Sequence, residues 1–291
     1  MASPLLSSLG KAARRARNLP ALLRRAPLFA NPFSFVRSEI SEVNAAVPHR
    51  LRGSDLSIYI RHHSTDVGVL NEVFLKDVYR FPDLVSSRLS ELSRPPRVLD
   101  LGGHVGMFGV YIFQRWPTAL VTSVEPDPLN AVILRRCVRR NRKFQAWTVI
   151  EAAVTNQTGT AWLKFGQGAA SQLCDGEADD AVEVQTIDAF DLLREADVVK
   201  MDIEGAEWQI LNDPRLATIR PAGLVLEYHR AGCPDRDPRS AIEAALVDAD
   251  FAVRHVPSDT TEMGVCWAWP AQQPAPGVVS ASRPRPASTD V

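Results

Sequence analysis

The sequence predicts an α/β fold built on a seven-stranded, mostly parallel sheet with helices on both faces. Two observations predict this fold. Short apolar segments alternate with amphipathic helical segments through the middle of the chain, and two successive apolar segments each end on an acidic residue. A chain of 291 residues with 45% hydrophobic residues is large enough for one such domain, so no second core is required. Parallel strands joined by helices imply right-handed crossovers.

The predicted elements of the sheet domain follow one another in a strand–helix rhythm. Strands are expected at residues 97–101, 120–125, 147–153, 197–203, 222–228, 251–256 and 263–269. Helices are expected at residues 106–115, 128–141, 204–212 and 238–249. Two segments with alternating apolar residues, 160–165 and 181–187, flank a stretch rich in Gly and Asp. We interpret them as a hairpin-like insertion whose tip is placed to cover a pocket.

The two ends of the chain differ from this core. Seven basic residues precede the first acidic residue, Glu39, and the last residues are rich in Pro, Ala and Ser. Between the basic end and the core, an alternating segment at 55–63 predicts a strand, and Ser-Thr-Asp at 64–66 predicts the start of a helix from Val67 to Asp77. We therefore expect four regions: a basic flexible leader, a strand-and-helix extension, the sheet domain and a disordered tail, at residues 1–38, 39–94, 95–270 and 271–291.

Charge and cysteine usage exclude several classes of protein. Without the basic leader the chain is acidic, which argues against a nucleic-acid substrate. The four cysteines form no C-x-x-C pair, as is typical of a reducing compartment, and no apolar run reaches transmembrane length. We expect a cytoplasmic protein. The leader fits a solvated basic helix, a segment in peripheral contact with a membrane, or an organellar transit peptide.

Residues 97–106, RVLDLGGHVG, form the most informative motif. An apolar strand ends on Asp100 and opens into a turn with Gly102, Gly103 and Gly106, where another molecule can approach the backbone closely. The dinucleotide fingerprint G-x-G-x-x-G would require glycine in place of Leu101, and a carboxylate at this point would repel a pyrophosphate. A carboxylate suits a cation instead, so the motif predicts S-adenosylmethionine as the cofactor. We interpret His104, within the turn, as a loop residue.

Glu125 ends the next strand along the chain, about one βαβ unit after the glycine turn. An acidic residue at this position can hydrogen-bond the hydroxyls of a ribose. This second acidic strand end supports the interpretation of an adenosyl-cofactor site.

A further set of polar residues follows the fourth and fifth strands of the predicted sheet. They are Asp202, Glu204, Glu227 and His229. The carboxyl ends of parallel strands meet at one edge of a sheet, so we expect these side chains to converge beside the cofactor. His229 is the expected general base because an imidazole has a pKa of about 6.5. Glu227, on the same side of a continued strand, is expected to orient its ring.

The carboxylates in this set have alternative roles. They can hold substrate hydroxyls, or together bind a divalent metal ion that acidifies a hydroxyl. Alternatively, Glu204 caps the next helix, Glu207 is a solvated or ion-paired residue of a helix face, and Glu227 is hydrogen-bonded to backbone only. Trp208 is expected to pack in the core. Asp202 is expected to contact both the cofactor and the acceptor.

With these residues identified, the chain resembles the FkbM-type S-adenosylmethionine-dependent methyltransferases, from about Arg61 to Trp269. The resemblance is carried by the motifs VLDLGGHVGMFG, SVEPDP, IEAAV, KMDIEGAEWQIL and LEYH. It implies a Rossmann-like methyltransferase sheet with an antiparallel last strand, and O-methylation of a hydroxyl on a sugar or secondary metabolite. The family's Thr-Ser-Asp entry turn is replaced here by Ser64, Thr65 and Asp66.

The resemblance also implies roles for individual residues. The glycine turn would face the methionine moiety with Asp100 near its amine, and Glu125 would hold the ribose. Pro126 would shape the turn beside it, and Ala152 and Ala153 would line the adenine pocket. The expected partner is a small hydroxylated acceptor. Two alternatives remain, a methyltransferase acting on a nitrogen, lipid or protein acceptor at a membrane, and a non-catalytic cofactor-binding protein.

Overall fold

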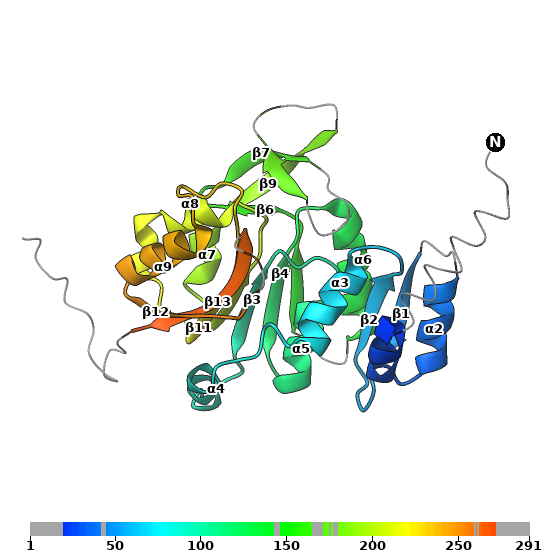
Figure 1. Cartoon of the computed structure of the whole chain (residues 1–291). Helices are drawn as coiled ribbons and strands as arrows, with labels where there is room; N and C mark the ends of the chain where they lie inside the picture. The colour runs from blue at the N-terminus through cyan, green and yellow to red at the C-terminus, as the bar shows by residue number, and fades with distance from the viewer. Residues whose placement is uncertain are drawn as a thin grey trace, which may run out of the picture.

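The computed structural model describes residues 20–41, 45–142, 146–164, 171–174, 176, 180–258, 260 and 262–271. Its centre is a seven-stranded sheet with the strand order β12-β13-β11-β10-β3-β4-β5 (Figure 1). The strands are β3 (Arg97–Leu101), β4 (Leu120–Val124), β5 (Trp147–Ile150), β10 (Val198–Met201), β11 (Gly223–His229), β12 (Phe251–His255) and β13 (Met263–Pro270). β13 runs antiparallel to both its neighbours and the other pairs are parallel, which confirms the predicted fold class.

Helices cover both faces of this sheet, giving three layers (Figure 1). One face carries α5 (Met107–Arg115) and α6 (Pro128–Arg140), and the other carries α7 (Ala189–Leu193), α8 (Glu207–Leu211) and α9 (Pro238–Asp248). Because successive side chains of a strand point to opposite faces, Val98 packs into one hydrophobic core and Leu99 into the other. α6 begins where Asp127 caps the backbone N–H groups of Leu129 and Asn130.

The predicted insertion forms a second sheet above the carboxyl ends of β3 and β4 (Figure 1). Its strands, in the order β6-β9-β7-β8, are β6 (Ala153–Thr155), β9 (Ala181–Asp188), β7 (Gly159–Lys164) and β8 (Gln172–Cys174). The antiparallel pairing of β7 with β9 confirms the expected hairpin. The single strand expected at 147–153 is wrong. The ladder with β4 ends at Ile150, and the chain continues as β6, which pairs with β9.

An N-terminal layer packs against α5 and α6. It consists of β1 (Ala46–Arg50), β2 (Ser57–Arg61), α3 (Asp66–Leu70) and the π-helical turn η2 (Asn71–Leu75), followed by α4 (Asp83–Ser90). β1 and β2 form an antiparallel hairpin, of which the sequence predicted only the second strand. The expected helix from Val67 to Asp77 is divided between α3 and η2. Thr65 makes no side-chain cap, and Ser64 Oγ accepts the N–H of Asp66 instead.

The flexible leader expected over residues 1–38 is wrong for the part that the structure describes. Residues 26–28 form the 3₁₀ turn η1 (Ala26–Leu28), and α2 (Pro32–Ile40) follows. Phe29 and Phe35 are 1% and 0% exposed, and their rings stack with centroids 4.6 Å apart. Burial of these two rings orders a segment that its basic charge had marked as solvated. Residues 1–19 and 272–291 lie outside the described residues, so the rest of the leader and the tail stay predictions.

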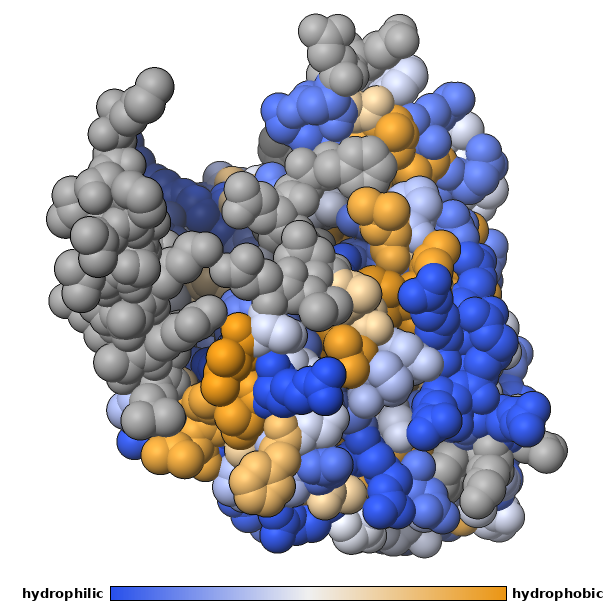
Figure 2. Space-filling model, turned by 90° about the vertical axis from the view of Figure 1, so that its right-hand side faces the viewer, coloured by the Kyte–Doolittle hydropathy of each residue, from blue (hydrophilic) through white to orange (hydrophobic). Residues whose placement is uncertain are grey.

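The outer side of the N-terminal layer mixes apolar and charged residues. Figure 2 views the molecule from this side and shows hydrophobic groups between hydrophilic ones. Phe33 is 85% exposed, and Leu23 and Ile40 are also exposed. Within the described ranges, no helix has the length and apolar character that crossing a membrane requires.

Candidate functional site

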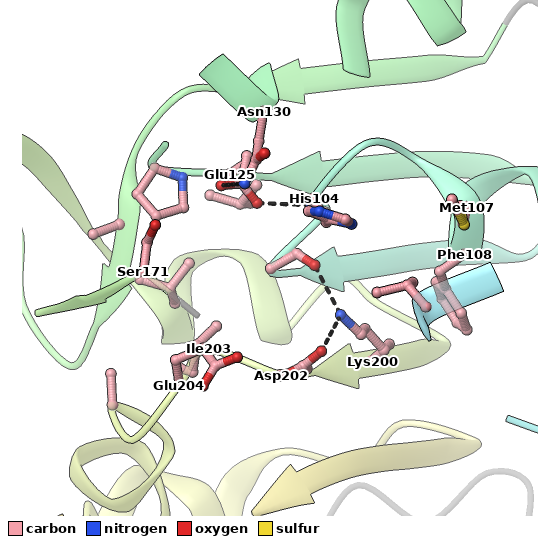
Figure 3. Close-up of a pocket in the computed structure, with 18 of the residues that line it drawn as sticks. His104, Met107, Phe108, Glu125, Asn130, Ser171, Lys200, Asp202, Ile203 and Glu204 are labelled. Atoms are coloured by element: carbon pink, nitrogen blue, oxygen red, sulfur yellow. Dashed lines mark hydrogen bonds and ion pairs between the residues drawn. The ribbon is translucent and has the colours of Figure 1, made fainter. Parts of the chain in front are cut away.

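A cavity that is partly open to solvent lies at the carboxyl ends of β3, β4 and β10 (Figure 3). The glycine turn lines it, and so do Leu163 of β7 and Leu173 of β8 in the insertion. Most of the tip that was expected to cover a pocket, residues 165–170, 175 and 177–179, lies outside the described residues. Val69, Glu72 and Val73 line it from α3 and η2, so the N-terminal layer also contributes a wall.

The structure brings most of the predicted site residues to this cavity. Those that line it are Gly102, Gly103, Glu125, Pro126, Ala153, Asp202 and Glu204. Five others lie next to it without lining it: Asp100, Gly106, Ala152, Glu227 and His229. The predicted acidic strand ends are therefore side by side, because β3 and β4 pair in register from Arg97–Leu120 to Leu101–Val124.

The glycines of the turn make room for other parts of the protein. Gly102 has a φ of 80°, and a Cβ there would lie 1.8 Å from the carbonyl oxygen of Asp202. A Cβ on Gly106 would lie 2.8 Å from a methyl carbon of Leu134. The sequence interpretation assigned the missing Cβ atoms to a cofactor. The structure shows that they allow close packing of the chain, while the backbone of Gly102 and Gly103 faces the cavity.

Asp100 lies buried beneath the turn. Its Oδ2 accepts a hydrogen bond of 2.9 Å from Ser123, and its Oδ1 lies 3.7 Å from the ammonium of Lys200. Burial raises the pKa of Asp100, although Lys200 and Ser123 act against this shift. Lys200 donates to the carbonyl of Gly102 at 2.8 Å and pairs with Asp202 at 3.1 Å (Figure 3). Asp100 thus lies beneath the turn, where its charge helps to stabilise the buried ammonium of Lys200.

Lys200 was not recognised from the sequence. The only signal for it is a charged residue inside the apolar strand segment VVKM. A buried lysine requires paired carboxylates, and the acidic ends of β3 and β10 supply them.

Glu125 lies at the cavity edge with its carboxylate held on both oxygens. Oε2 accepts the backbone N–H of His104 at 2.7 Å (Figure 3), and Oε1 accepts the N–H of Asp127 at 3.0 Å. The side-chain amide of Asn130 also donates to Oε1, at 3.3 Å. Burial raises the pKa of Glu125, and these hydrogen bonds oppose the shift. The hydrogen bonds fix the orientation of the carboxylate.

His229 is oriented by Glu207. Glu207 is fully buried, and its Oε1 lies 3.0 Å from His229 Nδ1 and 2.9 Å from the His229 backbone nitrogen. Its Oε2 accepts the N–H of Gly205 at 2.7 Å, and Trp208 donates to the carbonyl of His229 at 2.9 Å. Of the two descriptions considered for Glu207, solvated or ion-paired, the structure shows the ion pair, with His229. The expected role of Glu227 is wrong, because its Oε1 lies 3.8 Å from His229 Nε2, too far to orient the ring.

The crowding of carboxylates around His229 changes its protonation. Burial alone would lower the pKa of His229, but the hydrogen bond and charge of Glu207, with the charges of Glu204 and Asp202, raise it to about 9. Burial and the charge of Asp202 raise the pKa of Glu227 to about 8. Near neutral pH the imidazole is therefore mostly protonated.

Three of these residues could also hold a metal ion. Ligand atoms of Asp202, Glu227 and His229 all lie within 4.8 Å of one another. Carboxylates with an imidazole suit divalent ions such as Mn²⁺ or Zn²⁺, and a metal-bound histidine usually donates its other N–H to a carboxylate, as His229 does to Glu207. Lys200 already places a positive charge 3.1 Å from Asp202.

Glu204 connects His229 to the cavity. It lines the cavity, and its Oε2 lies 3.6 Å from His229 Nε2. Its backbone has a φ of 54°, in the left-handed region that side chains rarely adopt. Such strain is typical of functional positions. Glu204 lies outside α8, which begins at Glu207, so it is not the capping residue of that helix.

Comparison with known proteins gives a consistent result. A family model described as the methyltransferase FkbM domain matches residues 100–251. Methyltransferase sdnD of Sordaria araneosa is 21% identical over 256 residues, which cover 71% of this chain and 90% of that protein.

Two solved structures that resemble the chain at low identity are named as methyltransferases. A SAM-dependent methyltransferase from Agrobacterium tumefaciens has 12% identity and a TM-score of 0.44, with 80% of this chain and 72% of that chain covered. The precorrin-6y C5,15-methyltransferase from Geobacter metallireducens GS-15 has 13% identity and a TM-score of 0.39, with 67% of this chain and 92% of that chain covered.

Proposed function

The chain belongs to the FkbM family of methyltransferases, and from that premise we propose that it methylates a hydroxyl group of a sugar or secondary metabolite. It is an S-adenosylmethionine-dependent methyltransferase. The observation that supports a hydroxyl acceptor is the Glu207–His229 pair beside the cavity, with Nε2 of His229 directed toward Glu204. A hydroxyl is a weak nucleophile until its proton is removed, and a positioned imidazole is suited to that task.

The cavity residues fit the cofactor. S-adenosylmethionine supplies a methyl group on a positively charged sulfur. Glu125 would hold the ribose hydroxyls, and the backbone of Gly102 and Gly103 would face the methionine part. Ala153 and Leu163 offer an apolar surface for the adenine. His104, also in the cavity wall, has a buried Nδ1 without a hydrogen-bond partner among the described residues, as expected where a ligand supplies one.

Proton removal is assigned to His229. Its Nδ1 hydrogen is directed to Glu207, so Nε2 is the atom that accepts the proton of the acceptor hydroxyl. Glu204 and Asp202, at the cavity wall, would hold the acceptor's hydroxyls, and Glu207 would stabilise the imidazolium that forms. Holding the reacting atoms in line is the second task of the protein, and it can contribute about 7 to 11 kcal/mol in ideal cases.

The acceptor class is tested by incubating the protein with methyl-labelled S-adenosylmethionine and a panel of sugars and polyhydroxylated metabolites. The expected result is transfer to an acceptor with the label on oxygen, located by fragmentation mass spectrometry. Transfer to nitrogen alone would contradict the proposal. Cofactor binding without transfer to any class of acceptor would favour a non-catalytic cofactor-binding protein.

One observation favours a membrane-associated lipid or protein acceptor as the second candidate. Phe33, Leu23 and Ile40 are exposed in a segment that also carries the exposed Arg24 and Arg37. Apolar and basic side chains together bind the surface of anionic bilayers. Sedimentation with vesicles containing phosphatidylglycerol, compared with phosphatidylcholine alone, separates the two candidates. Binding only to the anionic vesicles would support the second.

A further inference from the structure

Arg61, at the end of β2, lies at the junction between the N-terminal layer and the cavity wall. We infer that Arg61 and Asp66 are positioning residues of the cofactor site, in a role that rests on the proposed assignment of Glu125 to the ribose. Both residues precede the segment 100–251 that matches the family model. Neither lines the cavity, so they act through the residues that do.

Asp66 fixes the guanidinium of Arg61. Its carboxylate accepts the Nε hydrogen of Arg61 at 3.0 Å, an NH2 hydrogen at 2.7 Å and the Arg61 backbone N–H at 2.8 Å. Asp66 is fully buried. Burial would raise the pKa of Asp66, but hydrogen bonds from His104 and Arg61 hold it well below its usual range, so the residue remains an anion. A two-point pair of this kind sets the plane of the guanidinium.

Arg61 in turn fixes Asn130 at the start of α6. Its NH2 group donates to Asn130 Oδ1 at 2.8 Å, so the amide nitrogen of Asn130 must point the other way. That nitrogen donates to Glu125 Oε1 at 3.3 Å. The orientation of one oxygen of Glu125 therefore depends on Arg61, 64 positions earlier in the chain.

His104 completes the path on the other side of Glu125. The two hydrogens of the Arg61 NH2 group are directed to Asp66 and Asn130, and none is left for His104 Nε2 at 3.0 Å. His104 Nε2 therefore carries a hydrogen and donates it to Asp66 Oδ1 at 3.1 Å. This contact holds His104 at a φ of 48°, and its backbone N–H donates to Glu125 Oε2.

The hydrogen bonds form a closed ring. Arg61, Asn130, Glu125, His104 and Asp66 are its members, in that order, and Asp66 returns to Arg61. Three members line the cavity, and each comes from a different element: the glycine turn, the end of β4 and α6. The N-terminal layer thus sets the orientation of both carboxylate oxygens of Glu125, the residue proposed to hold the ribose. Its η2 turn also supplies the part of the cavity wall at Glu72 and Val73.

The test is the dissociation constant of S-adenosylhomocysteine, measured by titration calorimetry on the full chain. Arg61→Ala should weaken binding at least about tenfold, on the scale of a lost charged hydrogen bond, because Asn130 loses its anchor and Asp66, which holds His104, loses its partner. Arg61→Lys should also weaken binding, since one ammonium cannot reach both Asp66 and Asn130. Arg52→Ala is the matched control, an exposed arginine of the same layer whose side chain contacts none of the ring.

A double-mutant cycle separates positioning from general stability. Arg61→Ala and Asn130→Ala act on the same ring, so the double variant should bind no more weakly than the worse single variant. Fully additive losses would overturn the inference. If circular dichroism shows that Arg61→Ala does not fold, the same cycle is measured with Arg61→Lys and Asn130→Ala, and fully additive losses of affinity would again overturn the inference.

Glu125→Ala distinguishes this inference from the proposed function. If Glu125→Ala loses affinity and Arg61→Ala and Arg61→Lys bind like the Arg52→Ala control, the positioning role is overturned and the ribose assignment stands. If Glu125→Ala itself binds normally, the ribose assignment fails, and the ring has no function in cofactor binding.

Discussion

Glu207 sets the orientation and the charge environment of His229, the proposed base, from a position with no access to solvent. It accepts both the backbone N–H and the Nδ1 hydrogen of His229, so it fixes the ring and adds a negative charge beside it. The charge raises the pKa of His229 to about 9 against the effect of burial. A general base must be unprotonated to act. If His229 is the base, as proposed, its neutral form is a stronger base but is less populated at neutral pH.

The pH dependence of kcat/KM should show this effect. In the parent, activity should rise with pH and level off near pH 9, because only the neutral form of His229 accepts a proton. Glu207→Gln removes the charge that raises the pKa of His229, so its rising limb should move to lower pH. Glu91→Gln, at an exposed position after α4, serves as the control. An unchanged limb in Glu207→Gln would contradict the assignment of this limb to His229.

Removal of His229 should separate chemistry from binding. His229→Ala should lower the single-turnover rate of methyl transfer roughly a hundredfold or more, the scale of a positioned general base, with little change in cofactor affinity. Glu227→Gln should retain part of the rate, because Glu227 does not orient the ring. Parental rates in His229→Ala would eliminate it as the base. Complete loss of parental activity on chelation would instead assign Asp202, Glu227 and His229 to a metal ion.

At the scale of elements, α2 and the hairpin β1–β2 belong to the folded part of the chain. Phe35 of α2 is fully buried against Phe29, His49 and His62. This packing joins a helix of the predicted leader to the strands of the N-terminal layer. The boundary of the folded domain therefore lies before residue 29, and a trimmed protein must keep this segment.

Truncation and core substitution test that boundary. A protein without residues 1–19 should keep its melting temperature and its cofactor affinity. Phe35→Ala should lower the free energy of unfolding by about 3 to 5 kcal/mol, the usual cost of removing a buried aromatic ring. Thermal unfolding and titration calorimetry measure the first two quantities, and urea unfolding followed by circular dichroism measures the free energy of unfolding. Phe33→Ala, at an exposed position of the same helix, is the control, and equal stability of the Phe33 and Phe35 variants would show that α2 does not pack as described.

The strands that carry the site residues were predictable from the sequence. The pairing of the insertion strands and the side chains that contact the site residues were not. Apolar runs ending in Asp100 and Glu125 mark β3 and β4, and parallel pairing brings the two ends together. The break between β5 and β6 was missed because only Glu151 interrupts the apolar residues between Val149 and Val154, and the pairing with β9 is what separates the two strands. The role of Glu207 was missed because helical spacing does not show which face of a short helix meets a neighbouring strand.

At the scale of the whole molecule, the site collects charged residues from segments far apart in the chain. Arg61 and Asp66 precede the sheet domain's first strand, and Glu207 and His229 come from α8 and β11. No single-sequence pattern relates such distant residues, which explains why the ring around Glu125 was not predicted. The convergence of carboxylates also makes the stability of the fold depend on pH.

Stability should fall as pH rises above neutrality. His229 has a folded-state pKa of about 9, above the ordinary value of 6.5, so the folded protein holds a proton that the unfolded chain releases. Its contribution is complete below pH 6.5 and is lost as pH rises through 9. Glu227, with its pKa raised to about 8, acts in the same direction. Denaturant unfolding at neutral pH and above pH 9 should show the loss, on the order of 2 kcal/mol, and His229→Ala should show less. An equal loss of unfolding free energy between the two pH values in the parent and in His229→Ala would contradict the raised pKa of His229.

The most direct test of the account is a crystal structure of the protein with S-adenosylhomocysteine. The account predicts the nucleoside in the cavity at the ends of β3, β4 and β10, with the ribose hydroxyls on Glu125 and the adenine between Ala153 and Leu163. The homocysteine part should lie along Gly102 and Gly103, with the sulfur toward Asp202. A nucleoside bound outside this cavity, or a ribose that makes no contact with Glu125, would contradict it.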